Sequence, residues 1–287
     1  KRFKTFDDVA IVFEPTGIYS NYLKQFCALN RIKAHIINPK RSSNFAKAIG
    51  NRSKTDEIDA RMLYTFKNLI TPDEIKVPEI DKDVETLSMY LASYEFVLKM
   101  RVSISNHIGA LKCSVNTPKE LLNTLKREIE RYRQIEKRVL DKAEQYIEKS
   151  KRLRDDYHNL LMIKSIGRVT AIALLYLFKN YKDTNRAQIT ALVGLDPTRK
   201  ESGTSVRGRR KISKSGNRTI RKILYFPTMN AIQNNKKIRD VYNRLIENHK
   251  PKKVALIAAM RKLLLIAHAV YKNKVKFLDN ADEKNDK

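Results

Sequence analysis

Cysteine and histidine are scarce in this 287-residue chain, and neither occurs in a pattern that predicts a metal site. The two cysteines, Cys27 and Cys113, are far apart and lack metal-ligand spacing, so we interpret both as ordinary buried thiols. The five histidines show no paired spacing, and each alone is more typical of a structural residue than of a ligand. The sequence therefore contains no signal for a cysteine- or histidine-based metal centre.

Long apolar runs are also missing. The longest, such as A-I-A-L-L-Y-L-F at residues 171–178, are too short to cross a bilayer. No secretory signal is visible. These absences predict a cytoplasmic protein that has no membrane partner.

Acidic residues are few relative to basic ones. The chain has 59 Lys and Arg residues against 31 Asp and Glu residues, a formal net charge of +28. Residues 151–287 carry 32 of the basic residues and 11 of the acidic ones, so the excess lies mainly in the C-terminal half. A surface built only for solubility usually mixes both signs, whereas this imbalance favours a polyanionic partner.

Glycine and proline nearly vanish between residues 82 and 160, where Gly109 and Pro118 are the only examples. Apolar residues recur there at helical spacing, which predicts two long helices joined by a turn, an antiparallel hairpin or coiled coil. Two interpretations are about equally supported: the hairpin dimerises, or it is a spacer arm that packs only on itself. The apolar positions are Leu87, Leu91, Tyr94 and Leu98, and then Leu125, Ile129, Tyr132, Ile135 and Val139.

The N-terminal residues predict a β-α-β unit. Residues 9–13 and 32–37 are short apolar runs typical of buried strands, and residues 18–29 between them predict a helix. Such strands should be parallel and covered by helices. The helix is expected to carry one apolar face, made of Tyr19, Tyr22, Leu23 and Phe26. Asn38-Pro39 closes the second strand, and a basic loop is expected over residues 40–54.

Three acids stand out in this basic chain. Asp56 and Asp59 lie three residues apart near the start of a predicted helix, so they share one helix face. Glu14 ends the first strand, where α/β sheets place their sites. Together the three carboxylates predict a Mg²⁺ site for phosphodiester chemistry, although either aspartate alone would suit a helix N-terminus. Glu57 points about 100° away around the helix and is excluded.

A second basic feature follows at residues 199–222, which hold ten Lys and Arg residues and one acid, Glu201. Ser, Gly and Thr are interleaved with the charges, which predicts a loop wrapped on phosphates rather than a merely solvated charge run. Ser202, next to Gly203, lies within it. The residues predicted to bind nucleic acid are Arg199, Lys200, Arg207, Arg209, Arg210, Lys211, Lys214, Arg218 and Arg221.

A weaker signal lies at residues 163–171, I-K-S-I-G-R-V-T-A, which resembles a helix-hairpin-helix turn. In that interpretation Gly167 allows a tight turn, and the amides after it face a phosphate.

Five motifs in order now carry a resemblance: E-P-T-G-I-Y at 14–19, I-N-P at 37–39, K-T-D-E-I-D-A at 54–60, I-K-S-I-G at 163–167, and E-S-G followed by K-S-G-N-R-T-I-R-K-I-L within 201–224. Together they resemble the DEDD-type insertion-sequence transposases, a family that includes the pilin-gene invertase. The resemblance covers essentially the whole chain.

The resemblance implies an α/β plus all-α architecture. A partial RNase H-like domain of the RuvC type would span residues 1–80, a coiled-coil insertion 81–160 and a helical transposase domain 161–278, before a polar tail at 279–287. It also implies DNA as substrate, a guide (bridge) RNA, a homo-oligomer (dimer or tetramer), and a location at the nucleoid of a bacterial or archaeal cell.

The family's Asp-Glu-Asp-Asp tetrad places its last three acids at Glu14, Asp56 and Asp59, which would hold Mg²⁺. Its serine nucleophile matches Ser202, and Ser205 remains an alternative. A serine hydroxyl is a weak nucleophile that needs a base or metal for activation. The surrounding arginines would hold the scissile phosphate and its developing charge.

One departure concerns the first aspartate of the tetrad, which the family carries on a strand well before the glutamate. Only 13 residues precede Glu14, and Asp7 and Asp8 lie at the opposite end of its strand. We therefore expect a truncated sequence or a decayed copy. Two alternatives to a serine recombinase stay open: a structure-selective nuclease that uses water, and an inactive nucleic-acid-binding remnant.

Overall fold

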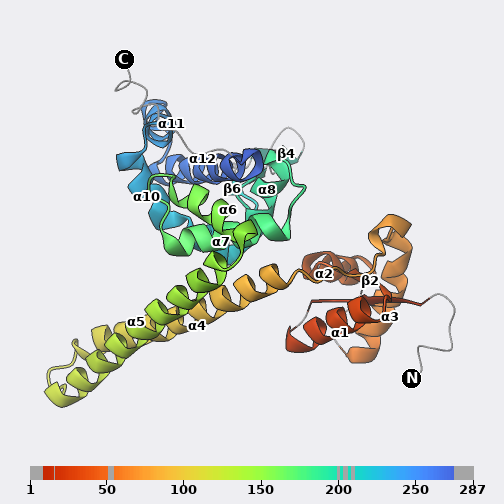
Figure 1. Cartoon of the computed structure of the whole chain (residues 1–287), viewed down its shortest axis with the longest axis horizontal. Coiled ribbons are helices and arrows are strands. Elements are labelled where there is room, and N and C mark those ends of the chain that lie inside the picture. The colour runs from red at the N-terminus through yellow and green to blue at the C-terminus, as the bar shows by residue number, and fades with distance from the viewer. Residues whose placement is uncertain are drawn as a thin grey trace. The chain divides into compact units, whose positions relative to one another are not determined.

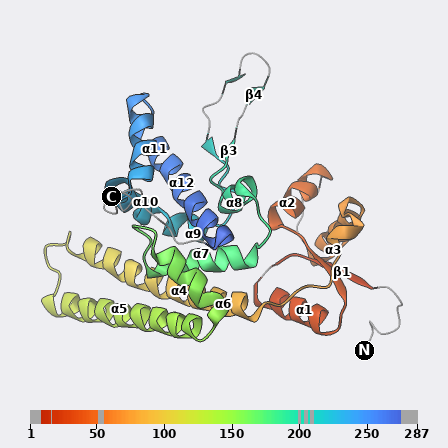
Figure 2. The same ribbon diagram turned by 45° about the horizontal axis from the view of Figure 1, so that its top comes forward.

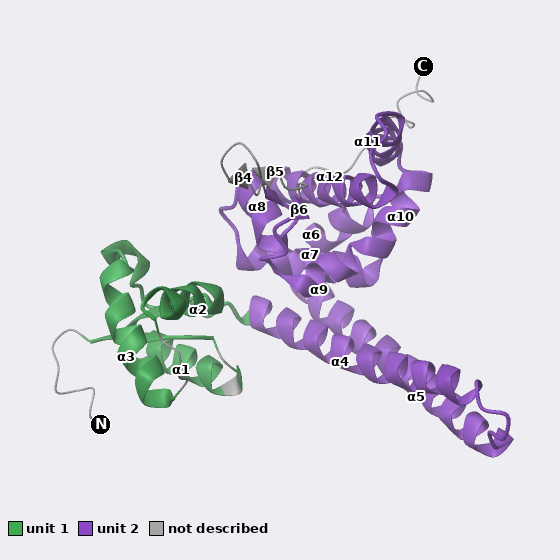
Figure 3. Cartoon of the chain, turned by 180° about the vertical axis from the view of Figure 1, so that it is seen from behind, with its two compact units in different colours: residues 1–82 green, residues 83–287 purple. Residues whose placement is uncertain are grey.

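The computed structural model describes residues 9–15, 17–50, 55–198, 201–202, 206–207 and 211–274. It is 73% helical with few strands, which agrees at this level with the predicted combination of α/β and helical parts. The chain divides into two compact units, residues 1–82 and 83–287 (Figures 1 and 3). Each unit has hydrophobic clusters of its own.

The first unit begins with the predicted β-α-β arrangement. Strand β1 (Ala10–Phe13), helix α1 (Gly17–Leu29) and strand β2 (Lys33–Ile36) follow in order. The strands are parallel, with Ala10 opposite Lys33 and Phe13 opposite Ile36. Both the strand order and the direction confirm the sequence prediction.

The apolar face predicted for α1 is divided in the structure. Leu23 packs inward against the cluster of Phe13, Cys27 and Ala34. Tyr19 and Tyr22, in contrast, are 86% and 65% exposed. The helix therefore buries Leu23 and Cys27 and leaves Tyr19 and Tyr22 exposed to solvent.

The two cysteines also differ in burial. Cys27 is buried, as expected, and burial raises the pKa of its thiol. Cys113 is exposed, so its interpretation as a buried thiol is wrong.

The basic loop expected from residue 40 is wrong over most of its length. Helix α2 (Pro39–Ala48) begins there, with Asn38 as its N-cap and Pro39 in its first turn. The Asn38 Oδ1 atom accepts a hydrogen bond from the Lys40 amide at 2.9 Å. Asn-Pro ends a strand and also begins a helix, because asparagine caps well and proline needs no amide partner in the first turn.

Helix α3 (Asp56–Phe66) is the predicted helix that carries the two aspartates, and two short 3₁₀ turns follow it at Lys67–Leu69 and Pro72–Glu74. Its buried Phe66 clusters with Ile37 and Ile70, and Val12 of β1 packs against them. The helix is therefore held against the sheet by its C-terminal half.

The second unit begins with the predicted hairpin of two long helices, α4 (Lys82–Leu111) and α5 (Lys119–Glu148), which lie side by side (Figure 2). Two polar contacts, one at the start of α4 and one farther along it, show that the pairing is antiparallel. The Tyr146 hydroxyl donates to Asp83 Oδ1 at 2.9 Å, and Arg101 Nε donates to Glu136 Oε1 at 2.6 Å.

The hairpin does not pack only on itself, so the spacer interpretation is wrong in that form. Leu87 and Leu91 of α4, with Ala143 and Ile147 of α5, belong to the main core of the second unit. Glu95 accepts a hydrogen bond from the Thr219 hydroxyl at 2.8 Å. The hairpin and the C-terminal helices thus share one unit, and the functional boundary placed at residue 160 stays a prediction.

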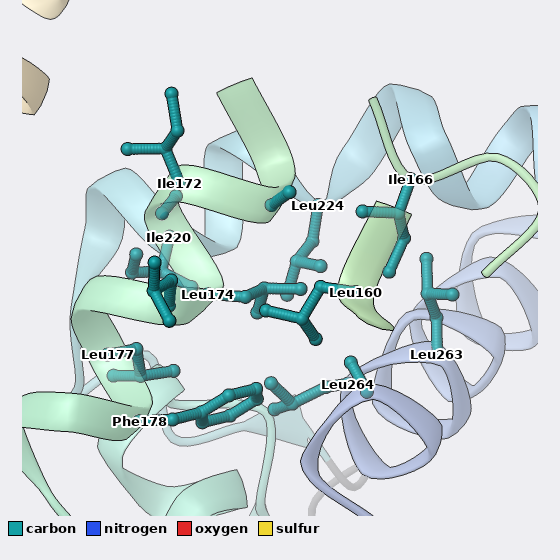
Figure 4. Close-up of a cluster of buried hydrophobic side chains, with 14 of the residues drawn as sticks. Leu160, Ile166, Ile172, Leu174, Leu177, Phe178, Ile220, Leu224, Leu263 and Leu264 are labelled. Carbon is teal, nitrogen blue, oxygen red and sulfur yellow. The ribbon is translucent and has the colours of Figure 1, made fainter. Parts of the chain in front are cut away.

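The C-terminal body is built around helix α7. Its side chains Ile172, Leu174, Leu177 and Phe178 are buried against residues of three other helices (Figure 4). Those partners are Leu160, Ile220 and Leu264, among others. The helices of the body are α6 (Lys151–Leu161), α7 (Arg168–Asn180), α8 (Arg186–Val193), α9 (Arg218–Ile223), α10 (Tyr225–Asn234), α11 (Lys236–Glu247) and α12 (Lys252–Asn273).

Helix α12 is apolar along most of its length, but Arg261 and Lys262 interrupt its sequence. It therefore does not stand out as a single long apolar run. By length and composition it is the one helix of the described residues that could cross a membrane. Its Leu263 and Leu264 are fully buried in the core of the second unit. A core helix of a soluble protein passes the same length and composition test.

A buried carboxylate ties three parts of this body together. Asp156 of α6 is 4% exposed and contacts Lys179 Nζ of α7 at 2.8 Å and Lys274 Nζ, after α12, at 2.5 Å. Lys179 is itself 5% exposed and also donates to the Arg152 carbonyl at 3.0 Å.

Replacing Asp156 should leave the Lys179 ammonium buried without its carboxylate. We expect Asp156→Ala to lower the free energy of unfolding by about 3–5 kcal/mol, measured by urea denaturation. Asp155→Ala is the matched control, since Asp155 is exposed and pairs with Arg154, and it should change stability by less than about 0.5 kcal/mol. Equal effects of the two substitutions would contradict this role for Asp156.

Candidate functional site

The three acids predicted to bind metal all lie in the first unit. Glu14 directly follows β1 and is half-buried, while Asp56 and Asp59 lie in the first turn of α3. The cap of α3 is Thr55, whose Oγ1 accepts from the Ile58 amide at 3.3 Å. Neither aspartate is therefore the N-cap of α3. If the two aspartates have a structural role, it is a favourable interaction with the helix dipole rather than capping.

The acids differ in their ionic partners. Glu57, excluded on the basis of helix geometry, pairs with Arg61 at 2.7 Å. Glu14, Asp56 and Asp59 form no ion pair with any described residue. Within the described part of the chain, no cation is paired with these carboxylates, which suits oxygen ligands for a divalent ion.

The structure does not assemble these acids into a metal centre. Across the described residues, no group of three or more His, Cys, Asp or Glu side chains is placed to hold a metal ion. The donor chemistry fits Mg²⁺, but the grouping of Glu14, Asp56 and Asp59 stays a prediction.

Ser202 lies in a segment that is paired rather than a plain loop. Strand β4 (Glu201–Ser202) is antiparallel to β5 (Val206–Arg207), and β3 (Pro197–Thr198) is antiparallel to β6 (Lys211–Ile212). We call residues 197–212 the serine arm. Ser202 is opposite Val206 in this register, and Arg207 is opposite Glu201. The predicted residues Arg199, Lys200, Arg209, Arg210 and Ser205 lie outside the described part of the chain.

The base of the serine arm is fixed by a close contact between two glycines. Gly194 ends α8 with φ +71°, a conformation that favours glycine. Gly216 lies so close to the Leu192 carbonyl that an added Cβ would overlap it. The Asn217 amide donates to the same carbonyl at 2.7 Å. The G-N part of the late motif thus has a structural explanation: it docks the chain that leaves the arm onto the end of α8.

Two further polar contacts secure this junction. The Ser213 hydroxyl donates to Asp196 Oδ1, and Asn217 Oδ1 caps α9 by accepting from the Ile220 amide at 3.0 Å. The arm therefore joins the body through side chains whose hydrogen bonds are already satisfied within the protein.

The predicted phosphate-binding cations separate into two kinds. Arg221 donates to the Val193 carbonyl at 2.7 Å, and burial, with the neighbouring Arg218, lowers the pKa of its guanidinium. It is part of the junction. Lys211, Lys214 and Arg218 are exposed and free to meet solvent or a ligand.

A cavity of about 630 Å³ lies beside the junction. Its lining comes from the arm and its flanking residues, α9, α10 and α12, and the described residues of the lining include no acidic side chain. Lys222, Lys253, Tyr225 and Phe226 line it but are not among the residues predicted from sequence. Tyr225-Phe226 directly after a basic helix was a usable signal, whereas Lys253 approaches only through the packing of α12. The lining residues are Leu195, Ile212, Lys214, Arg218, Arg221, Lys222, Tyr225, Phe226, Lys253, Ile257 and Met260.

The helix-hairpin-helix interpretation of residues 163–171 is not supported in its detail. The left-handed residue of the turn is Ser165, with φ +81°, whereas Gly167 has an ordinary φ of −92°. Arg168 at the start of α7 is held by Asp141 and Glu144 of α5, both at 2.5 Å. Carboxylates so close to this helix start oppose the binding of a phosphate there.

Comparison with known proteins gives matches to two protein families. Residues 1–111 match a family described as transposase of the DEDD type, and residues 157–243 match the transposase IS116/IS110/IS902 family. The first range contains Glu14, Asp56 and Asp59, and the second contains Ser202.

Two individual proteins are also similar to the chain. They are the pilin gene-inverting proteins of Moraxella lacunata and Moraxella bovis, each 25% identical over 269 residues. The aligned region covers 93% of this chain and 81% of each relative.

The junction of the arm can be tested by adding one methyl group. We expect Gly216→Ala to destabilise the protein by about 1–3 kcal/mol or more, because the new Cβ would displace the Leu192 carbonyl. Gly109→Ala is the matched control: its Cβ would meet nothing within 4 Å in exposed α4, and it should stabilise by about 0.5–1 kcal/mol. The measurement is the thermal unfolding midpoint of both variants. An unchanged midpoint for Gly216→Ala would exclude the close contact between Gly216 and the Leu192 carbonyl.

Proposed function

Because the chain belongs to the IS110 family of insertion-sequence transposases, enzymes that act on DNA, we propose that it cleaves and rejoins DNA strands through a covalent link at Ser202. The observation that carries the proposal is the placement of the two family matches. One contains the acids and the other contains the serine, in the order of the family's motifs.

The proposed step is a transesterification. The Ser202 oxygen attacks the phosphorus of a DNA phosphodiester and forms a serine–phosphate bond, while the bond to the leaving sugar oxygen breaks. The serine proton ends on that sugar, which departs as a hydroxyl. The reverse reaction with a hydroxyl of another strand rejoins the DNA, so no water or nucleotide cofactor is consumed.

Several described residues support this chemistry. The antiparallel pairing of β4 with β5 gives the Ser202 backbone a defined partner. Lys211, Lys214 and Arg218 follow in the same segment and are exposed, so they can neutralise the backbone phosphates of DNA. Bound Mg²⁺, held by Glu14, Asp56 and Asp59, would supply activation of the attacking oxygen and stabilisation of the leaving one.

The remaining features of the proposal follow from family membership. The first unit would form part of an RNase H-like domain, a guide RNA would direct target choice, and the protein would act in the cytoplasm at the nucleoid. With an RNA guide, base pairing reads the sequence and the protein needs few base-specific side chains.

We also propose a homo-oligomer that uses the hairpin. Helix α4 buries Leu87 and Leu91 within its own unit but exposes Met89 and Phe96, at 62% and 61%. These two exposed residues are seven apart, the spacing of a coiled-coil seam, and so offer a second apolar stripe for another copy.

The serine is tested by trapping its adduct. With Mg²⁺ and element-end DNA, we expect the protein to form a protein–DNA adduct that survives denaturation. Ser202→Ala should abolish it, whereas Ser205→Ala should retain it. Cleavage at the normal rate by Ser202→Ala without an adduct would instead establish a nuclease that uses water, and binding without cleavage by the unsubstituted protein would establish an inactive remnant.

The acids are tested by isosteric substitution. Asp56→Asn and Asp59→Asn should each lower DNA cleavage by ~100-fold or more, because an amide is a poorer ligand for a divalent ion. Glu57→Gln lies in the same helical turn and should leave cleavage within about twofold of the starting rate, since Glu57 pairs with Arg61. Similar losses in all three variants would remove the argument for a metal site.

A further inference from the structure

We propose that the cavity beside the serine arm holds an unpaired nucleotide, with its base against Tyr225 and Phe226 and its neighbouring phosphates on the cationic rim. This inference rests on the proposed function only in taking nucleic acid as the partner. The observations that carry it are the shape, the aromatic wall and the uncompensated charge of the cavity, all within the second unit.

The aromatic wall is placed for stacking. Phe226 is 75% exposed and Tyr225 is 41% exposed, which leaves apolar rings in contact with water. Their centroids are 5.4 Å apart and the rings are perpendicular, so each supports the orientation of the other. Exposed aromatic rings beside a basic surface are the usual platform for the bases of a single strand.

The interior of the cavity is apolar beneath its charged rim. Leu195, Ile212, Ile257 and Met260 contribute to its lining, and Leu195 and Met260 are nearly fully buried. A volume of about 630 Å³ lies within the range of sites that enclose small organic molecules. Paired bases are stacked inside a duplex and present no ring face to such a recess, so the occupant must be an unpaired or extruded base.

The rim supplies the charge complement for a nucleotide rather than for an apolar peptide. Lys214, Arg218, Lys222 and Lys253 are all exposed, and none forms an ion pair with a described residue. No carboxylate of a described residue lines the cavity. Four cations held around an apolar recess repel one another, and the phosphates that flank a bound base would relieve this repulsion.

A second cationic cavity in the same unit provides a contrast. It has about 430 Å³ and lies between the start of α8 and the end of α12, where Arg186, Lys262 and Lys272 line it. Among the described residues, no tyrosine or phenylalanine lines this cavity, and its one aromatic residue, His268, is buried. The described lining can therefore attract phosphate without a tyrosine or phenylalanine ring for stacking, so substitutions at the two cavities compare charge with stacking.

The test measures binding of the full chain to fluorescent oligonucleotides of one sequence as single-stranded DNA, single-stranded RNA and duplex DNA. Phe226→Ala should weaken binding of at least one single strand by about 5- to 150-fold and leave duplex binding within about twofold. Arg186→Gln should reduce binding of all three probes by a similar small factor, through charge alone.

An apolar control guards against a general surface effect. Met229→Ala, on the same helix and 45% exposed, should retain single-strand binding. Thermal unfolding of each variant confirms that it folds, which is expected because the substituted side chains are exposed.

Each outcome decides the proposal. Selective loss with single-stranded RNA or with single-stranded DNA supports it and identifies the strand that occupies the cavity. Equal loss on duplex, or no loss on either single strand, overturns it. Because binding needs no cleavage, failure of the Ser202 adduct would reject the proposed reaction without affecting this result, and failure here would leave the adduct experiment unaffected.

Discussion

Burial of α7 on nearly every side governs the architecture of the second unit. A helix with Ile172, Leu174, Leu177 and Phe178 all in the core cannot lie on a surface without exposing a large apolar area. Other helices must therefore surround it, and α6, α9 and α12 do so. The inner end of the α4–α5 hairpin joins the same core. What resembles an independent arm in the sequence is thus anchored by the helix that the whole body covers.

This packing also determines where the charged residues gather. Helix α9 is held by the core through Ile220 and Leu224, so Arg218 and Lys222 must lie on its outer side. The start of α12 brings Lys253 to the same place, and the contact of Gly216 with α8 brings Lys214. Cations far apart in sequence form one rim because apolar burial fixes the helices that carry them, with no attraction among the charges themselves.

The sequence predicted helices and strands of both units correctly where apolar residues recur at regular spacing. The parallel β-α-β unit, the helix that carries Asp56 and Asp59, and the two long helices are all present. Prediction failed where one signal has two structural meanings. Asn38-Pro39 begins α2 as well as ending a strand, Gly167 is not the left-handed residue of its turn, and the basic segment around Ser202 contains paired strands rather than only a loop.

By itself, the sequence determined the chemistry available to this protein: a strong positive charge, the three carboxylates Glu14, Asp56 and Asp59, a serine among arginines, and an order of motifs that resembles the IS110 transposases. These are properties of residue type and spacing, which survive without a fold. Only the tertiary structure decided which cations belong to the arm's junction and which face outward, and that Tyr225, Phe226 and Lys253 share one cavity. These arrangements depend on contacts between residues that are distant in the chain. Burial of an apolar core selects such contacts, and it leaves no local sequence pattern from which they could be predicted.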